Sequence, residues 1–150
     1  MAESARRASI VSGYFNPLHV GHLRMMEAAR ALTGRLIVIV NNDAQQMMKK
    51  GRIIVPLADR MEIVRALRVA DEVIAAVDDD ATVRRTLRVI RDEHPDTELI
   101  FANGGDDRSN TAEISETGVC EELRIALRFG VGGAEKADSS TRINAALSQQ

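Results

Sequence analysis

The chain has one cysteine, Cys120, no tryptophan, and few aromatic residues, which make up 3% of its 150 residues. A single cysteine cannot form an internal disulfide or a multi-cysteine metal site, and it is typical of a protein from a reducing compartment. Scarce aromatic side chains argue against stacking platforms for single-stranded nucleic acid. A net charge of −2, from 20 basic and 22 acidic side chains, argues against a strongly basic nucleic-acid binder.

Long hydrophobic runs are also missing. No apolar stretch approaches the roughly 20 residues of a membrane-spanning helix. Arg6 and Arg7 are not followed by the apolar segment of a signal peptide. We therefore expect a cytoplasmic protein that binds neither membrane nor nucleic acid. The length and the 45% hydrophobic content suit a single domain, residues 1–150.

Short apolar runs alternate with segments of helical periodicity. The runs predict strands at 9–12, 36–40, 72–77, 99–102 and, less regularly, 124–131. The periodic segments predict helices around 18–32, 57–67 and 83–90, with Asp80 as N-cap and His94 as the end of the third, and a last helix near 140–147. This alternation predicts a three-layer α/β fold, a Rossmann-like parallel sheet of about five strands with helices on both faces. Ligands of such sheets bind at the carboxyl ends of the strands.

The segment 13–22, GYFNPLHVGH, follows the first predicted strand and opens the first helix. His19 and His22 are three residues apart and fall on one side of the helix's first turn. Gly21 leaves room for close approach, and the helix N-terminus offers free N–H groups and partial positive charge. These features indicate a phosphate site with two imidazole donors. The alternative is that both histidines simply cap or line the turn; two histidines without a third ligand make a poor zinc site.

This H-x-G-H motif resembles that of the nucleotidyltransferase superfamily, which contains the small bacterial cytidylyltransferases and adenylyltransferases. The resemblance implies that His19 and His22 bind the triphosphate and stabilise charge on the α-phosphate during transfer. Asn16 stands where the family usually has Asp, which removes a charge but keeps a hydrogen-bonding side chain. The resemblance assigns the rest of the nucleotide-binding loop to Gly13, Tyr14, Phe15, Asn16 and Gly21.

Two basic residues extend the resemblance. Lys49, six residues after Asp43, is similar to the family's Lys that contacts the transferring phosphates and the acceptor, with Lys50 as the next choice. We place it in a loop beyond the second strand; the alternative is a solvated surface pair. The resemblance also implies that Arg60 binds the acceptor's phosphate or phosphonate, for which a guanidinium fork is well suited. The alternative for Arg60 is an ion pair on a helix surface.

Two later segments complete the comparison. Asn103, Gly104 and Asp106 are assigned to the nucleotide, Asp106 because it resembles the family's Asp near the nucleotide and the metal, and Arg108 is assigned to the acceptor. Ser139, Ser140 and Thr141 are similar to the family's second signature, whose hydroxyls and N–H groups hold the β- and γ-phosphates; the alternative is a helix cap without a ligand. The Arg-Thr-x-Gly-Ile run of many cytidylyltransferases is absent before this cluster, and Lys136 or Arg142 is the candidate replacement.

The resemblance as a whole implies a cytidylyltransferase. It would transfer CMP from CTP, with Mg²⁺, to a small phosphate or phosphonate acceptor and release pyrophosphate. The phosphonate cytidylyltransferase domain of fosfomycin-type antibiotic biosynthesis is similar, which suggests 2-hydroxyethylphosphonate as acceptor. Alternatives are an adenylyltransferase that uses ATP on a phospho-sugar or similar acceptor, and a non-catalytic nucleotide-binding module. The family also implies a homodimer and leaves open a fusion to another pathway enzyme; the metal ligands are unassigned.

Overall fold

The computed structural model describes residues 6–103 and 116–131. Ten elements follow one another: β1 (Arg6–Gly13), α1 (Val20–Thr33), β2 (Leu36–Val40), α2 (Asp43–Lys50), α3 (Leu57–Arg65), β3 (Glu72–Ala75), α4 (Arg84–Glu93), β4 (Thr97–Ala102), α5 (Thr117–Leu123) and β5 (Ala126–Arg128). The strands form one sheet in the order β3-β2-β1-β4-β5, and every pairing is parallel. The predicted five-stranded α/β fold is confirmed.

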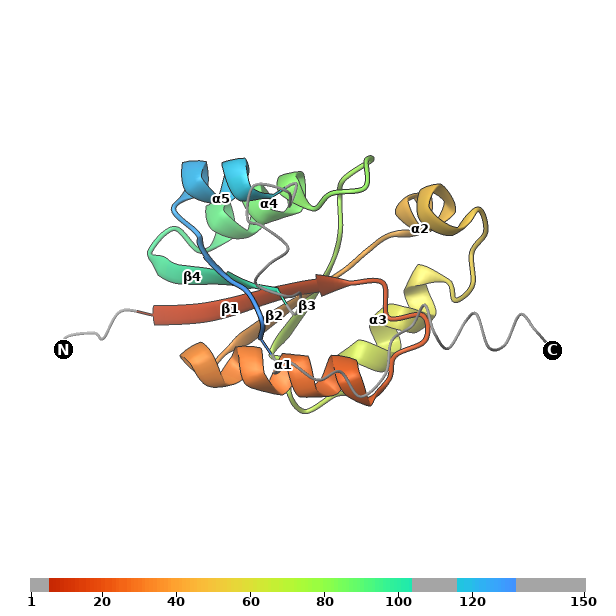
Figure 1. Cartoon of the computed structure of the whole chain (residues 1–150), viewed down its shortest axis with the longest axis horizontal. Coiled ribbons are helices and arrows are strands. Elements are labelled where there is room, and N and C mark those ends of the chain that lie inside the picture. Colours follow the sequence, from red (N-terminus) through yellow and green to blue (C-terminus); the bar gives the residue numbers. More distant parts are fainter. Residues whose placement is uncertain (1–5, 104–115, 132–150) are drawn as a thin grey trace.

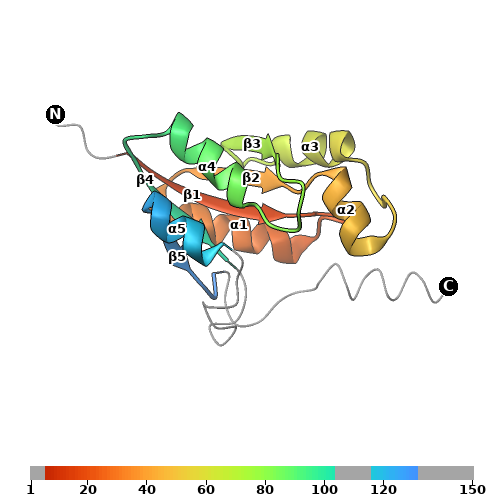
Figure 2. The same ribbon diagram turned by 90° about the horizontal axis from the view of Figure 1, so that it is seen from above.

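Three layers enclose two apolar clusters (Figures 1 and 2). Helices α1 and α3 cover one face of the sheet, and α4 and α5 cover the other. Because successive side chains of a strand point to opposite faces, β2 supplies both clusters. Its Val38 packs with Met26 and Val64, whereas its Ile37 packs with Leu87. All five residues of β2 are buried, as expected for a strand covered on both sides.

The sheet has a switch point beside β1. The chain passes from β1 to β2 on one side and later places β4 on the other side. The crevice beyond the carboxyl ends of strands at such a point is the usual ligand site of open α/β sheets. β1 and β2 end level with each other, since Gly13 is in register with Val40. Helix α2 lies beyond these ends, next to the loop that joins β1 to α1 (Figure 1).

Local differences from the sequence-based expectations are confined to short elements. The third and fifth strands are shorter than expected, and α2 and α5 were not predicted as helices. The N-cap of α4 is Val83 rather than Asp80. Asp80 accepts bonds from the N–H and hydroxyl of Thr82, whereas Asp78 accepts the N–H groups of Arg85 and Thr86 in the first turn of α4.

The end of α4 at His94 is confirmed. The helix expected at 140–147 lies outside the described residues. Within the described ranges, no helix has the length and apolar character needed to cross a membrane.

Candidate functional site

The two histidines of the β1–α1 loop form a reciprocal cap at the start of α1. His19 is the N-cap, and its Nδ1 accepts the backbone N–H of Gly21 at 3.0 Å. The Nδ1 of His22 accepts the backbone N–H of His19 at 3.2 Å. The two rings are stacked, with centroids 3.8 Å apart. This is a capping box in which imidazoles take the positions that hydroxyl and carboxyl side chains usually occupy.

The caps determine which nitrogen carries the proton. Because Nδ1 of each ring accepts an N–H bond, the proton of each neutral imidazole is on Nε2, which makes Nε2 a donor. Burial, together with the nearby His19, lowers the pKa of His22 from 6.5 to about 4. His22 is therefore a neutral donor at physiological pH. The capping alternative is present in the structure, and in it Nε2 is the nitrogen of each ring that carries the proton.

Phe15 has a packing role in this loop. It is buried, lies in the core cluster of α1 and α3, and contacts the His22 ring edge-on at 5.1 Å between centroids. Its φ of 54° is in the left-handed region, where a bulky side chain is uncommon. A Cβ on Gly13 would come within 2.7 Å of the Phe15 ring. Gly13 therefore makes room for Phe15, and Phe15 supports His22, while the assignment of both residues to the nucleotide-binding loop stays a prediction.

Asn16 is buried and donates its amide to Oε1 of Gln46 in α2 at 2.6 Å. The same oxygen accepts the backbone N–H of Ile54, also at 2.6 Å. Gln46 meanwhile donates to Asp43 and to the carbonyl of Val55. The oxygen that faces position 16 is therefore an acceptor that requires a donor, which Asn supplies and an ionised Asp does not. This explains the departure from the family's usual Asp at position 16.

The Arg60 side chain is buried and hydrogen-bonded within the protein. The residue is 1% exposed, and its Nη1 donates to the carbonyls of Tyr14 and Asn41. Nε donates to the carbonyl of Val55, and Nη2 pairs with Asp43 at 2.8 Å. Each of these three nitrogens has a protein partner, and the expected contact with an acceptor phosphate stays a prediction. Arg60 instead joins the loop after β1, the end of β2 and the first turn of α2.

Lys49 lies in the last turn of α2, not in a loop. Its Nζ is 4.6 Å from the centroid of the Tyr14 ring, so α2 brings this ammonium to the histidine loop. Partial burial, and secondarily the neighbouring Lys50, lowers the pKa of Lys49. Burial raises the pKa of Tyr14, against the opposing effect of Arg60. The structure therefore brings Tyr14, Lys49 and the two histidines to one end of the sheet.

Asn103 follows β4 at the same edge of the sheet. Its backbone N–H donates to Arg128 and its carbonyl accepts from Val131, which extends the pairing of β4 and β5 toward the site. The other expected contacts with nucleotide and acceptor lie outside the described residues: Gly104, Asp106, Arg108, Ser139, Ser140 and Thr141.

One group of potential metal ligands occurs in the described part of the chain, formed by Glu72, Glu93 and His94. Glu72 begins β3 and Glu93 ends α4, so the group lies at the edge of the sheet opposite the histidine loop. Glu72 is paired with Arg35 and contacts His94, each at 3.5 Å. These contacts account for the cluster, and its position does not fit a magnesium ion that acts on phosphates at His19 and His22.

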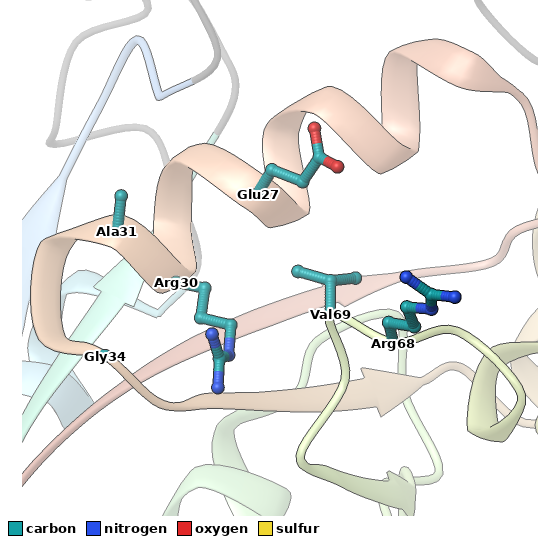
Figure 3. A pocket seen from close by; sticks show the side chains of 6 residues that line it. All are labelled: Glu27, Arg30, Ala31, Gly34, Arg68 and Val69. Carbon is teal, nitrogen blue, oxygen red and sulfur yellow. The ribbon is translucent and has the colours of Figure 1, made fainter.

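An open pocket between α1 and the turn after α3 is also separate from the loop (Figure 3). Glu27 and Arg30 line it from α1, and Arg68 and Val69 line it from the turn after α3. Arg30 is bonded to Asp71. The pocket reaches Gly34, which is the C-cap of α1, so it lies toward the end of α1 opposite to His19.

Three polar residues that start and anchor α2 were not expected from the sequence: Asn42, Gln45 and Gln46. Asn42 and Gln45 form a capping box, and Gly51 is the left-handed C-cap. Asn followed by Gln three residues later, with Gly beyond the end, is a recognisable helix signal. Apolar periodicity did not reveal this helix because its buried positions are Gln45 and Gln46.

The family model described as "Cytidylyltransferase-like" matches residues 10–144. The chain belongs to this family. It is 40% identical over 112 residues to the bifunctional protein HldE of Streptomyces coelicolor, and the match covers 73% of this chain and 22% of that protein. It is 36% identical over 120 residues to the FAD synthase of Thermococcus onnurineus, a match that covers 79% of this chain and 69% of the synthase.

A solved structure gives the same fold. The lipopolysaccharide core biosynthesis protein from Thermoplasma volcanium superposes with a TM-score of 0.61 at 22% identity, covering 88% of this chain and 98% of that one. At this identity the likeness concerns the fold alone. The chain spans less than a third of the HldE proteins that it resembles, at 22% of one and 29% of another.

Proposed function

We propose that this chain is a nucleotidyltransferase that moves the adenylyl group of ATP to a small phosphorylated acceptor. Membership of the cytidylyltransferase-like family supports the reaction class. The FAD synthases among the relatives are named for a product that contains an adenylyl group. These relatives favour ATP over the CTP that the sequence analysis expected, and they lend no support to a phosphonate acceptor or a role in antibiotic biosynthesis.

The observation that carries the proposal is the orientation of the two imidazoles. His19 and His22 cap α1 through Nδ1, so each Nε2 is a neutral N–H donor at the helix N-terminus and at the sheet's switch point. Donors and helix dipole there favour an anion. The anion that fits a family of nucleotidyltransferases is the triphosphate. Such donors stabilise the charge that develops on the α-phosphate without needing to exchange protons.

The chemistry needs no general base. An oxygen of the acceptor's phosphate attacks the α-phosphorus, and the bond from that phosphorus to the bridging oxygen of the β-phosphate breaks. Pyrophosphate leaves with the electron pair. A phosphate monoester loses its second proton near pH ~6, so the attacking dianion is present at neutral pH. Mg²⁺ would arrive on the triphosphate oxygens and offset their charge.

Lys49 supplies the movable positive charge in this proposal. An ammonium on a four-carbon stem suits a phosphate that changes position during transfer. The contacts expected of the residues outside the described ranges, Gly104, Asp106, Arg108, Ser139, Ser140 and Thr141, stay part of the proposal as nucleotide and acceptor ligands. So does the homodimer. The match to only part of proteins named bifunctional supports a fusion to, or cooperation with, a second enzyme.

A pyrophosphate-release assay tests the proposal. Each of the four nucleoside triphosphates is combined with Mg²⁺ and with a panel of sugar phosphates, flavin mononucleotide, glycerol phosphate and phosphonates. We expect release with ATP and one phosphorylated acceptor, and a fall of about 10²- to 10³-fold in kcat for His22→Ala or Lys49→Ala. Arg65→Ala, an exposed change on α3, is the control and should retain parental turnover.

Two outcomes would overturn the proposal. Turnover with CTP but not ATP would establish the cytidylyltransferase alternative that the sequence analysis preferred. Tight binding of ATP without pyrophosphate release for any acceptor would favour the non-catalytic nucleotide-binding module. Both histidines are present and both are oriented as donors, which favours catalysis over mere binding.

A further inference from the structure

Lys49 poses a positioning problem. It is exposed in the last turn of α2, on a flexible side chain that ends in a strongly hydrated charge. The carbonyl end of its own helix attracts cations and would draw the ammonium away from the loop. A residue that holds the ammonium near the histidines would therefore reduce the number of conformations that the Lys49 side chain samples before transfer.

The Tyr14 ring is placed to do this. Nζ of Lys49 lies 4.6 Å from the ring centroid, within the range of a cation–π contact. The Tyr14 carbonyl accepts from the buried guanidinium of Arg60 at 3.0 Å, and its hydroxyl donates to the carbonyl of Gln45 at 3.5 Å. Gln45 is one helical turn before Lys49. Tyr14 is thus attached at its backbone to the buried network and at its hydroxyl to the helix that carries the ammonium.

The chemical nature of this partner matters. Among the side chains that the structure describes, no carboxylate pairs with Lys49 within 4.0 Å. A carboxylate would cancel the charge that a phosphate needs, whereas a neutral ring attracts the ammonium through its quadrupole and leaves the charge intact. The sequence analysis assigned Tyr14 to the nucleotide; the geometry gives it a different partner.

We propose that Tyr14 is a positioning residue, whose ring holds the ammonium of Lys49 beside the histidine loop without neutralising it. The inference rests on the proposed function of Lys49 at the transferring phosphates. In this proposal the shape of the Tyr14 ring contributes packing, whereas its π-electron density attracts the ammonium of Lys49.

Ring fluorination tests this separation, because it withdraws electron density with little change in shape. Phenylalanine, 4-fluoro-, 3,5-difluoro- and 3,4,5-trifluorophenylalanine are placed at position 14. We expect kcat to fall stepwise along the fluorinated series, by about fivefold in total relative to Tyr14→Phe, in which the hydroxyl is already absent. In a Lys49→Met background the series should be flat. The same analogues at Phe101, a buried ring in β4, should leave kcat unchanged.

A second measurement does not depend on turnover. Tyr14 is the single tyrosine of the chain, so biosynthetic 3-fluorotyrosine gives one ¹⁹F resonance. Lys49→Met should shift this resonance, and Arg65→Met should not. A flat fluorination series in an active parent, or a resonance that ignores Lys49→Met, would overturn the proposal. If the parent releases no pyrophosphate with any nucleotide, the proposed function fails and the positioning role with it, while the resonance still shows whether the contact exists.

Discussion

His22 combines two tasks that ordinary caps do not share. Its Nδ1 accepts a backbone N–H and so stabilises the first turn of α1, which requires a neutral ring, while its Nε2–H is the side of the ring that can donate. Its low pKa results from burial and from the stacked His19, so the requirement for a neutral ring is met by the fold itself. Protonation of Nδ1 would break the cap and add a charge beside another imidazole.

This coupling predicts an acid-dependent loss of stability. The folded pKa of about 4 lies below the unfolded value of 6.5, so the unfolded state binds more protons between these pH values. Stability from neutral His22 is present above pH 6.5 and is lost as pH falls toward 4. Because the ring is only partly buried, we expect a loss of about 1–2 kcal/mol rather than the full shift. Urea unfolding at pH 7 and pH 4.5 measures it.

His22→Gln is the matched control for that experiment. Gln is the usual partner at this position of a capping box and does not titrate, so it keeps the cap and removes the proton. The difference in unfolding free energy between parent and variant should grow in the variant's favour as the pH falls. A difference that stays constant with pH would contradict the assignment.

Asn16 gives a second prediction at this scale. In Asn16→Asp the new carboxylate faces Oε1 of Gln46, which already accepts from Ile54, so two acceptors meet in a buried site. We expect a loss of about 1–3 kcal/mol in unfolding free energy, measured by urea denaturation at pH 7. Ala44→Asp adds the same charge at an exposed position of α2 and should be nearly neutral. Unchanged stability in Asn16→Asp would mean that Gln46 reverses its amide.

At the scale of elements, α2 is held by polar groups rather than by an apolar face. Gln45 donates to the carbonyls of Asp80 and Thr82, and Gln46 bonds to the chain before α3. Arg60 of α3 completes the attachment through Asp43. A helix anchored in this way has a defined position because each bond is directional. This is how a short helix can present Lys49 accurately.

Arg60→Met should therefore lower the free energy of unfolding rather than weaken binding of the acceptor. The substitution leaves the carbonyls of Tyr14, Asn41 and Val55 without this donor and removes the ion-pair partner of Asp43. We expect a loss of at least about 3 kcal/mol in unfolding free energy. Arg65→Met, exposed on the same helix, should change it by about 0.5 kcal/mol or less. A stable Arg60→Met with a raised KM for the acceptor would instead restore the anion-binding expectation.

At the scale of the whole molecule, the site is assembled from separate parts of the chain. The loop after β1, helix α2 and the residue after β4 meet at the carboxyl edge of the sheet, on either side of the switch point. A ligand that contacts several of these segments stabilises the folded state as a unit. Nucleotide binding should therefore be visible as a shift in global unfolding.

Thermal unfolding with Mg²⁺ and nucleotide tests this. At a nucleotide concentration of 100 times Kd, binding stabilises the fold by about 2.7 kcal/mol, which for a chain of this size is roughly 5–10 °C in Tm. We expect this shift with ATP in the parent and a much smaller one in His22→Ala, after each is compared with its own ligand-free Tm. An equal shift with all four nucleotides would show that binding depends on the triphosphate alone.

Much of this architecture could be predicted from local patterns. The β-branched run 36–40 and the apolar periodicity of the longer helices indicate the buried faces directly. The spacing of apolar residues along a strand or helix sets which face of that element is apolar. The H-x-G-H segment likewise predicts an anion site, and that site stays a prediction. These features are encoded within a few neighbouring residues, so one sequence is enough to recognise them.

Other features are decided by contacts between residues far apart in the chain. Whether Arg60 binds a ligand or a buried carbonyl depends on Tyr14 and Asn41, 46 and 19 residues away. The partner of Lys49 is the ring of Tyr14, 35 residues earlier in the chain. The hydrogen bond of the Asn16 side chain likewise depends on Gln46. A polar side chain carries the same local signal whether its partner is solvent, substrate or protein. The sequence by itself determined where the candidate site lies in the fold, and only the tertiary structure decided which of its polar side chains bond to distant parts of the chain.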